Sequence, residues 1–300
     1  MSAPVLPETV VAAPRRRRSW TLGLGLVLVG AVVAIALLSL VWLPYAPADT
    51  TGSRLEGANP AHWLGTDKLG RDLATQLMIG ARIALVVGLG AVAVGALLGV
   101  TIGLLAAFAA AWLDDTISAA LDVVIAFPVL LLAMLIVAAQ GASLVSVIVA
   151  IGLAMSAVVA RLTRVLTKRV LAEQYVTAAR TSGTRWPGVV LRHILPNIWP
   201  TLSVNLALQF GVAVLAEASL SYLGLGAPPP NASWGRLLQE AQGTVVTAPV
   251  GAIAPGLALV ALVIGVNFIA DGLRDVADPS RRVSSRRASS RRPSSRRSAR

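Results

Sequence analysis

Few side chains in this 300-residue sequence could carry out covalent chemistry. The chain has two histidines, His62 and His193, and no cysteine, which excludes disulfides, thiolate catalysis and cysteine metal sites. It contains neither the H-E-x-x-H pattern of zinc proteases nor the G-x-x-x-x-G-K-[ST] loop that cradles nucleotide phosphates. We therefore expect a protein that is not an enzyme and that holds no metal, cofactor or ATP itself.

One polar segment, residues 177–197, lies between two apolar stretches and could bind another protein. Its sequence is TAARTSGTRWPGVVLRHILPN. Good helix formers lead up to Gly183, which can adopt a positive φ and end a helix. Thr184 is a candidate N-cap for a second helix, and Pro187 suits its first turn. The spacing predicts a helix, a glycine elbow and a second helix, which could fit a groove on another protein. The alternative is a basic loop that only fixes membrane orientation.

Glu217 is the third notable group, because it follows a long uncharged run and a carboxylate is costly in hydrocarbon. Such a group should face protein or water, so Glu217, together with the nearby Ser221 and Tyr222, is a candidate pathway or gate residue. The alternative is a hydrogen-bonded carboxylate that serves packing.

The composition places these groups in a membrane. The chain is 56% hydrophobic and 13% charged, against about 25% charged residues in an ordinary soluble domain. Its net charge of +12 comes from thirteen arginines in two terminal runs, 15–18 and 281–300, without which the remainder has a net charge of −1. The basicity therefore belongs to ends that would lie against a membrane, and we expect no nucleic-acid partner.

Long gaps between charged residues predict an all-α protein with six transmembrane helices, because about 20 apolar residues cross a bilayer. The predicted spans cover residues 20–43, 83–109, 117–139, 144–160, 200–222 and 249–270. The first is expected to be an uncleaved anchor, since its apolar run is longer than that of a signal peptide. Within the third, Pro128 should kink the helix, and a tight turn at 140–143 should precede the fourth.

Two smaller features predict local packing. Gly95, Gly99 and Gly103 put small residues on one stripe, where another helix could approach closely. Asp67, Arg71 and Asp72 lie in a stretch with leucines on one helical face, 69–77, which predicts a membrane-surface helix with local ion pairs.

Basic residues set the predicted orientation, since they concentrate in cytoplasmic segments. Twenty-one fall in 1–19, 161–199 and the region from 274 onward, and five fall in the segments on the opposite side. Both termini and the segment 161–199 are therefore predicted to be cytoplasmic. This orientation puts the two histidines on opposite sides of the membrane, which argues against an intramembrane enzyme.

Residues 177–197 resemble the EAA loop of binding-protein-dependent ABC importer permeases. Ala178, Ala179, Gly183, Leu195 and Pro196 stand at matching spacing, while Thr177 replaces the glutamate of the consensus and His193 its isoleucine. Four blocks, at 62–85, 192–197, 216–235 and 271–279, are similar to the C-type subunit of the dipeptide, oligopeptide and nickel branch.

This resemblance implies a type I ABC importer permease fold over residues 20–279, in the bacterial inner membrane. It implies a coupling loop, 161–199, whose EAA-loop residues are Tyr175, Thr177, Ala178, Ala179, Gly183, Arg192, Leu195 and Pro196. Those from Tyr175 to Gly183 would contact an ATPase, and those from Arg192 onward would turn the chain back into the next span. ATP and Mg²⁺ would reside in one or two ATPase subunits. A second, B-type permease, an extracytoplasmic solute-binding protein and the lipid membrane would be the other partners, and di- or oligopeptides the cargo.

Two alternative functions stay open at this point, as does the role of the C-terminal tail. The same architecture could import a nickel chelate or another small solute. A gradient-driven secondary transporter would explain only the spans, and the ionisable residues that it should carry near the middle of the bilayer are absent from the uncharged runs. The Arg/Ser-rich tail, 280–300, is expected to be disordered, and it could either bind anionic lipid or remain in solution.

Overall fold

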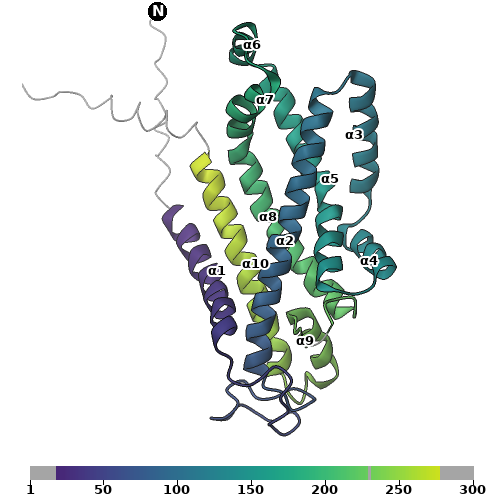
Figure 1. Ribbon diagram of the computed structural model, residues 1–300. Coiled ribbons are helices and arrows are strands. Elements are labelled where there is room, and N and C mark those ends of the chain that lie inside the picture. The colour runs from purple at the N-terminus through teal and green to yellow at the C-terminus, as the bar shows by residue number, and fades with distance from the viewer. Residues whose placement is uncertain (1–17, 229–230, 278–300) are drawn as a thin grey trace, which may run out of the picture.

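The structure of the chain is a computed structural model that describes residues 18–228 and 231–277 (Figure 1). Within these residues the fold is helical, and extended backbone pairs at one isolated bridge, between Thr66 and Asp72. The predicted tail, 280–300, and the first 17 residues of the predicted N-terminal segment, 1–19, lie outside the described residues.

Five long helices form the body, and shorter ones join them. The long helices are α1 (Arg18–Val41), α2 (Leu73–Phe108), α5 (Leu144–Leu171), α8 (Leu195–Tyr222) and α10 (Val250–Ala277). The short ones are α3 (Ala111–Ala126), α4 (Val129–Gln140), α6 (Gln174–Thr181), α7 (Trp186–Val189) and α9 (Trp234–Ala241), with η1 (Val190–Ile194) and η2 (Gln242–Thr244). Among the described residues, the five long helices are long and apolar enough to cross a membrane, and α3 and α4 make a sixth if they count as one span.

The long helices contain nearly all of five predicted spans, but several run further than the apolar residues alone indicated. α2 begins at Leu73 instead of residue 83, and α5 continues past residue 160 to Leu171. Charged residues interrupt the apolar pattern without ending a helix, because backbone hydrogen bonds continue beyond the hydrocarbon boundary. The charge gaps therefore locate spans better than they locate helix ends.

The third predicted span differs most from the structure. α3 and α4 are two separate helices bent by 89° at Phe127 and Pro128, instead of one kinked helix across 117–139. Phe127 has extended backbone angles, which the residue before a proline prefers, and Pro128 precedes the first turn of α4. The proline was correctly identified as the break, but the size of the bend was not foreseen.

The small-residue stripe of α2 packs against α5 within the same chain, as predicted. A Cβ added at Gly99 would lie 2.7 Å from the Ser156 carbonyl oxygen, and one at Gly103 would lie 2.5 Å from that of Ala160. On the α5 side, Gly152 approaches the Ala91 carbonyl oxygen in the same way. The two backbones come this close because glycine has no side chain to separate them.

The membrane-surface helix predicted around residues 67–77 is wrong. Residues before Leu73 form a loop, and Asp72 is the N-cap of α2, where it accepts a hydrogen bond from the Thr75 backbone N–H at 2.7 Å. The leucine spacing that suggested a surface helix instead belongs partly to the first turns of α2. The predicted local ion pair does form, between Arg71 and Asp67 at 2.6 Å.

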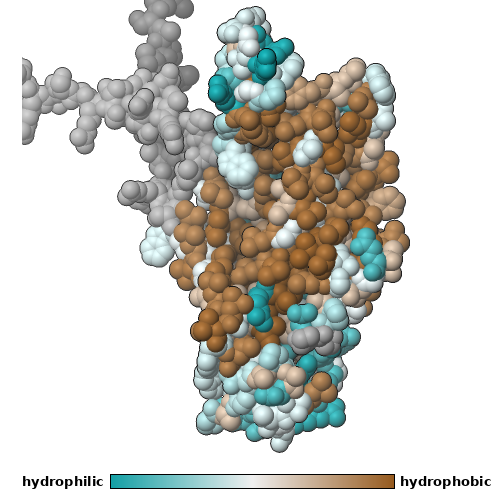
Figure 2. Space-filling view, viewed as in Figure 1, coloured by the Kyte–Doolittle hydropathy of each residue, from teal (hydrophilic) through white to brown (hydrophobic). Residues whose placement is uncertain are grey.

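The two ends of the helix bundle are polar and its middle is apolar. Figure 2 shows hydrophobic side chains over the middle of the molecule, with hydrophilic ones gathered at α6 and at the opposite end. α6 and α7 lie at one end, and α9 with the loop that precedes α2 lies at the other (Figure 1). The segments predicted to be cytoplasmic and extracytoplasmic are therefore separated along the bundle.

Candidate functional site

The predicted glycine elbow is present at the end of α6. Gly183 has a φ of +89°, the Gly183 N–H donates to the Arg180 carbonyl at 3.0 Å, and the Thr184 N–H donates to the Ala179 carbonyl at 3.0 Å. This pair of bonds closes a helix whose last carbonyls would otherwise lack partners. Gly183 therefore ends the helix and reverses the chain, as the sequence predicted.

The second helix begins slightly later than predicted. Arg185, not Thr184, occupies the N-cap position of α7, and it makes no side-chain capping hydrogen bond. Thr184 belongs instead to the turn that closes α6, where its N–H donates to the Ala179 carbonyl. Pro187 lies in the first turn, where its missing N–H costs nothing. A π-helical turn, η1, then joins α7 to α8, so the chain is helical from Trp186 to Tyr222.

A small apolar cluster fixes the elbow to the bundle. Its buried members come from α5, α6, α7, η1 and α8: Val170, Val176, Val189, Ile194 and Ile198, each at most 7% exposed. Leu104 of α2 packs against them. Burying these side chains stabilises one position of α6 and α7 relative to the long helices.

The predicted coupling residues divide into an exposed group and a half-buried pair. Tyr175, Thr177, Ala178, Gly183, Arg192 and Pro196 are exposed, while Ala179 and Leu195 are partly covered. The structure also brings the two ends of the segment together, since Asn197 of α8 donates a hydrogen bond to the Tyr175 hydroxyl. The Tyr175 and His193 rings lie with centroids 6.0 Å apart. Sequence spacing did not predict these contacts of α6 with η1 and with the start of α8.

A further contact at the elbow was missed. The Arg180 guanidinium lies 4.0 Å from the centroid of the Trp186 ring, and Trp186 meets Phe108 of α2 edge to face at 5.0 Å. Aromatic residues at predicted helix ends were the only sequence signal, and it does not identify a partner.

The three candidate pathway residues near the end of α8 differ in how exposed they are. Glu217 is 2% exposed and accepts a hydrogen bond from the Ser221 hydroxyl at 2.7 Å. Gly226 packs so closely on Ser221 that it leaves no room for a Cβ, whereas Tyr222 is 38% exposed. In this conformation Glu217 faces protein, as the cost of a buried carboxylate requires, and Ser221 partners it.

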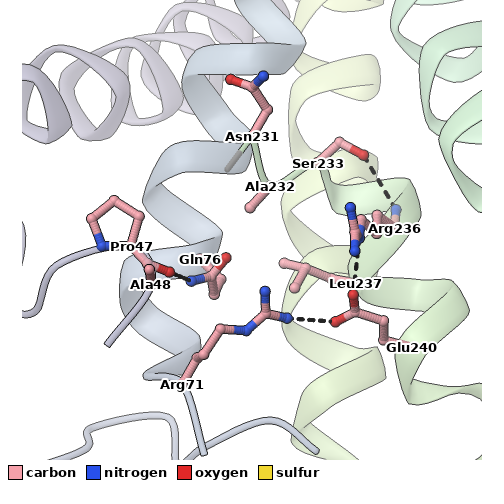
Figure 3. A pocket seen from close by; sticks show the side chains of 10 residues that line it. All are labelled: Pro47, Ala48, Arg71, Gln76, Asn231, Ala232, Ser233, Arg236, Leu237 and Glu240. Atoms are coloured by element: carbon pink, nitrogen blue, oxygen red, sulfur yellow. Dashed lines mark hydrogen bonds and ion pairs between the residues drawn. The ribbon is translucent and has the colours of Figure 1, made fainter. Parts of the chain in front are cut away.

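At the α9 end of the bundle, a pocket of about 260 Å³ opens between the loop before α2 and α9 (Figure 3). Glu240 accepts from Arg71 at 2.8 Å and from Arg236 at 2.9 Å, so one carboxylate joins the two segments. Gln76 donates to the Pro47 carbonyl at 2.9 Å on the opposite wall. Across residues 18–228 and 231–277, no group of three or more His, Cys, Asp or Glu side chains is arranged to hold a metal ion.

Residues 99–283 match a protein family described as the inner membrane component of binding-protein-dependent transport systems. The matched region contains the elbow, the Glu217 region and α9. The chain belongs to this family.

Individual family members are similar over most of the chain. The dipeptide transport system permease protein DppC of Alkalihalophilus pseudofirmus is 37% identical over 259 residues, which cover 86% of this chain and 85% of the relative. The glutathione transport system permease protein GsiD of Pectobacterium atrosepticum is 40% identical over 250 residues, 83% of each chain.

A solved structure has the same fold. A chain from an inward-facing structure of the MetNI methionine ABC transporter superposes with a TM-score of 0.57 at 20% identity, covering 68% of this chain and 96% of that one. The predicted type I ABC importer permease fold and the inner-membrane location are thus confirmed.

Proposed function

We propose that this chain is the permease subunit of an ATP-driven importer of di- or oligopeptides and forms half of the translocation pathway. Two observations support peptides as the cargo: relatives of similar length are named for dipeptide and for glutathione transport, and glutathione is itself a tripeptide. A carried peptide would be delivered by a solute-binding protein at the α9 end of the bundle and released at the α6 end.

The observation that carries the coupling proposal is the exposed elbow formed by α6 and α7. The elbow combines small exposed residues such as Ala178 with a buried apolar cluster that holds it in place. A small, rigid helical surface can enter a groove on another protein without a large ordering cost. We infer that the groove belongs to an ATPase subunit and that closure of two ATPase domains around ATP pushes the elbow.

The same proposal assigns the hydrolysis to partner subunits. Because the sequence has no phosphate-binding loop, ATP and Mg²⁺ would be held by one or two ATPase subunits, and this chain would be non-catalytic. A second, B-type permease would supply the other half of the pathway. The exposed surfaces around α9 and the loop before α2 are available to the solute-binding protein.

The cargo is tested with the complete transporter, purified through a tag on this chain and reconstituted with its binding protein. ATP hydrolysis is measured with dipeptides, longer peptides, glutathione and a nickel–histidine chelate as separate additions. We expect peptides to stimulate hydrolysis and the chelate to have no effect. Stimulation by the chelate alone would overturn the peptide assignment, and solute uptake driven by an ion gradient without ATP would overturn the transporter class.

The docking surface is tested by cross-linking, and because this chain has no native cysteine, an introduced cysteine is its one thiol. A single cysteine at Ala178 should form a cross-link to an ATPase subunit through a short reagent that joins a thiol to an amine. The matched control is Ala61→Cys, since Ala61 is also an exposed alanine but lies in the loop before α2. Equal yields at the two positions would show that the elbow is not the docking surface.

A further inference from the structure

The elbow reaches α2 through side chains alone. Along the chain, α6 and α7 are connected directly to α5 and α8, whereas α2 ends at Phe108, far earlier in the sequence. If the elbow moves, α5 and α8 must follow because they are its continuations. α2 follows only if noncovalent contacts hold it.

Three side chains form such a contact, which we call the elbow stack: Arg180 of α6, Trp186 of α7 and Phe108 of α2. The Arg180 guanidinium lies 4.0 Å from the Trp186 ring centroid, and its Nη1 donates to the Thr184 carbonyl at 3.2 Å. The Phe108 ring meets Trp186 at 5.0 Å with an interplanar angle of 71°. Cations over indole rings and edge-to-face aromatic pairs both have a preferred geometry, so the stack fixes orientation as well as distance.

A second contact lies one turn earlier on α2. Leu104 packs against the apolar cluster of the elbow, which contains Val176 and Val189. The end of α2 therefore has two contacts in this region, the apolar packing of Leu104 on the cluster that holds the elbow and the elbow stack itself. Apolar packing is non-directional, whereas the stack resists rotation.

The opposite end of α2 contacts α9 through another aromatic side chain. Trp234 donates from its indole N–H to the Leu77 carbonyl at 3.0 Å, and its ring fills the space beside Gly80. Between the two ends, the glycine stripe packs α2 directly on α5. α2 is thus a continuous 36-residue helix with one specific aromatic contact near each end.

We propose that Phe108 and Trp186 are positioning residues that fix the orientation of the end of α2 on the elbow, in addition to the packing of α2 on α5, so that ATP-driven movement at α6 is carried along α2 to α9. This inference rests on the proposed docking of the elbow on an ATPase. It predicts that breaking the stack separates ATP hydrolysis from the response of α9, with the transporter still assembled.

The test uses a reporter far from the stack. Ala241, the last residue of α9, is 6% exposed and lines the same small cavity as Leu73 of α2, so a cysteine there should react slowly with a maleimide at rest. In the complete transporter carrying Ala241→Cys, addition of MgATP and vanadate should change the labelling rate at least twofold. Phe108→Leu, which keeps an apolar side chain without a ring, should reduce that change at least by half, although ATP hydrolysis measured separately without vanadate continues.

Phe108→Tyr is the matched control, because it keeps the aromatic edge and should preserve the nucleotide-dependent labelling. Trp186→Leu breaks the same contact from α7 and should behave like Phe108→Leu, which covers the case in which one variant fails to fold. The inference is overturned if Phe108→Leu retains the full change or if the parent shows none. An Ala178→Cys variant that fails to cross-link to the ATPase would instead refute the proposed docking, so the two failures are distinguishable.

Discussion

Gly99 of α2 faces Ser156 of α5 so closely that a Cβ on Gly99 would lie 2.7 Å from the Ser156 carbonyl oxygen. We expect Gly99→Ala to lower the stability of the permease by about 1–3 kcal/mol, since overpacking forces two backbones apart. Because the obstructing atom is backbone, no rotamer change can relieve the clash. The change is measured as a drop in the thermal unfolding midpoint of the purified protein.

The control is Gly30→Ala on α1. Among the described residues, nothing lies within 4 Å of a Cβ added at Gly30. The extra methyl group should therefore leave the unfolding midpoint unchanged or raise it, because alanine favours helix over glycine by up to about 1 kcal/mol. Equal destabilisation by both variants would show that the tight approach of α2 to α5 does not exist.

Asp114 holds two cations of α5 at once. Arg164 makes a bidentate pair with it, with an Nη2–Oδ2 distance of 2.7 Å, and Lys168 reaches the same Oδ2. We expect Asp114→Asn to destabilise the protein by about 2–4 kcal/mol, somewhat less than a fully buried pair, since Lys168 remains 43% exposed. Thermal unfolding of the variant checks this value.

Asp122→Asn provides the comparison on the same helix. Asp122 pairs with Arg161 at 3.0 Å, but both side chains are 59% exposed. Exposed pairs contribute about 0–1 kcal/mol, so this variant should be close to the parent. If Asp122→Asn lowered the stability more than Asp114→Asn, the greater burial of Asp114 would not account for the strength of its ion pairs.

Asp72 joins the loop before α2 to the first turn of that helix. Its Oδ2 accepts from the Thr75 N–H at 2.7 Å and from the Thr75 hydroxyl at 2.8 Å, while Oδ1 lies 3.0 Å from His62 Nδ1. Asp72→Ala should cost about 1–3 kcal/mol, because it removes a helix cap and leaves buried polar groups without a partner.

The matched variant is Asp72→Asn, whose side-chain oxygen can still cap the helix and which should therefore be milder. Limited proteolysis of the loop that contains His62, compared between the two variants, measures the difference. Identical cleavage of Asp72→Ala and the parent would show that the cap does not hold the loop.

The features that could be predicted from the sequence are those that depend on residues close together in the chain. Gly183 and Pro187 were predictable because their backbone preferences act within a few residues, and the predicted elbow was found where those residues lie. The apolar runs gave the long helices for the same reason. Their ends were less accurate, since charged residues such as Arg82 lie within continuous helix.

Contacts between distant residues were not predictable. Arg71 and Glu240 are 169 residues apart, and Asp114 and Arg164 are 50 apart, so no local pattern pairs them. The 89° bend at Phe127 and Pro128 also depends on how α4 packs against α5, which a proline alone does not specify. Thr184 was misplaced as a cap, since it lies in the turn that closes α6 and α7 begins one residue later than expected.

Bulky charge on the elbow should uncouple transport from ATP hydrolysis. Ala178 is exposed and Ala179 is partly buried, so Ala178→Glu changes the proposed docking surface with little effect on internal packing, whereas Ala179→Glu affects both. We expect each variant to insert normally and to lose most solute import, because a carboxylate must be desolvated in the docking groove. Import and membrane level are measured together for both variants. Wild-type import by Ala178→Glu at normal expression would remove the exposed face of α6 from the docking surface, whereas loss of import by Ala179→Glu alone would point to a packing defect within the elbow.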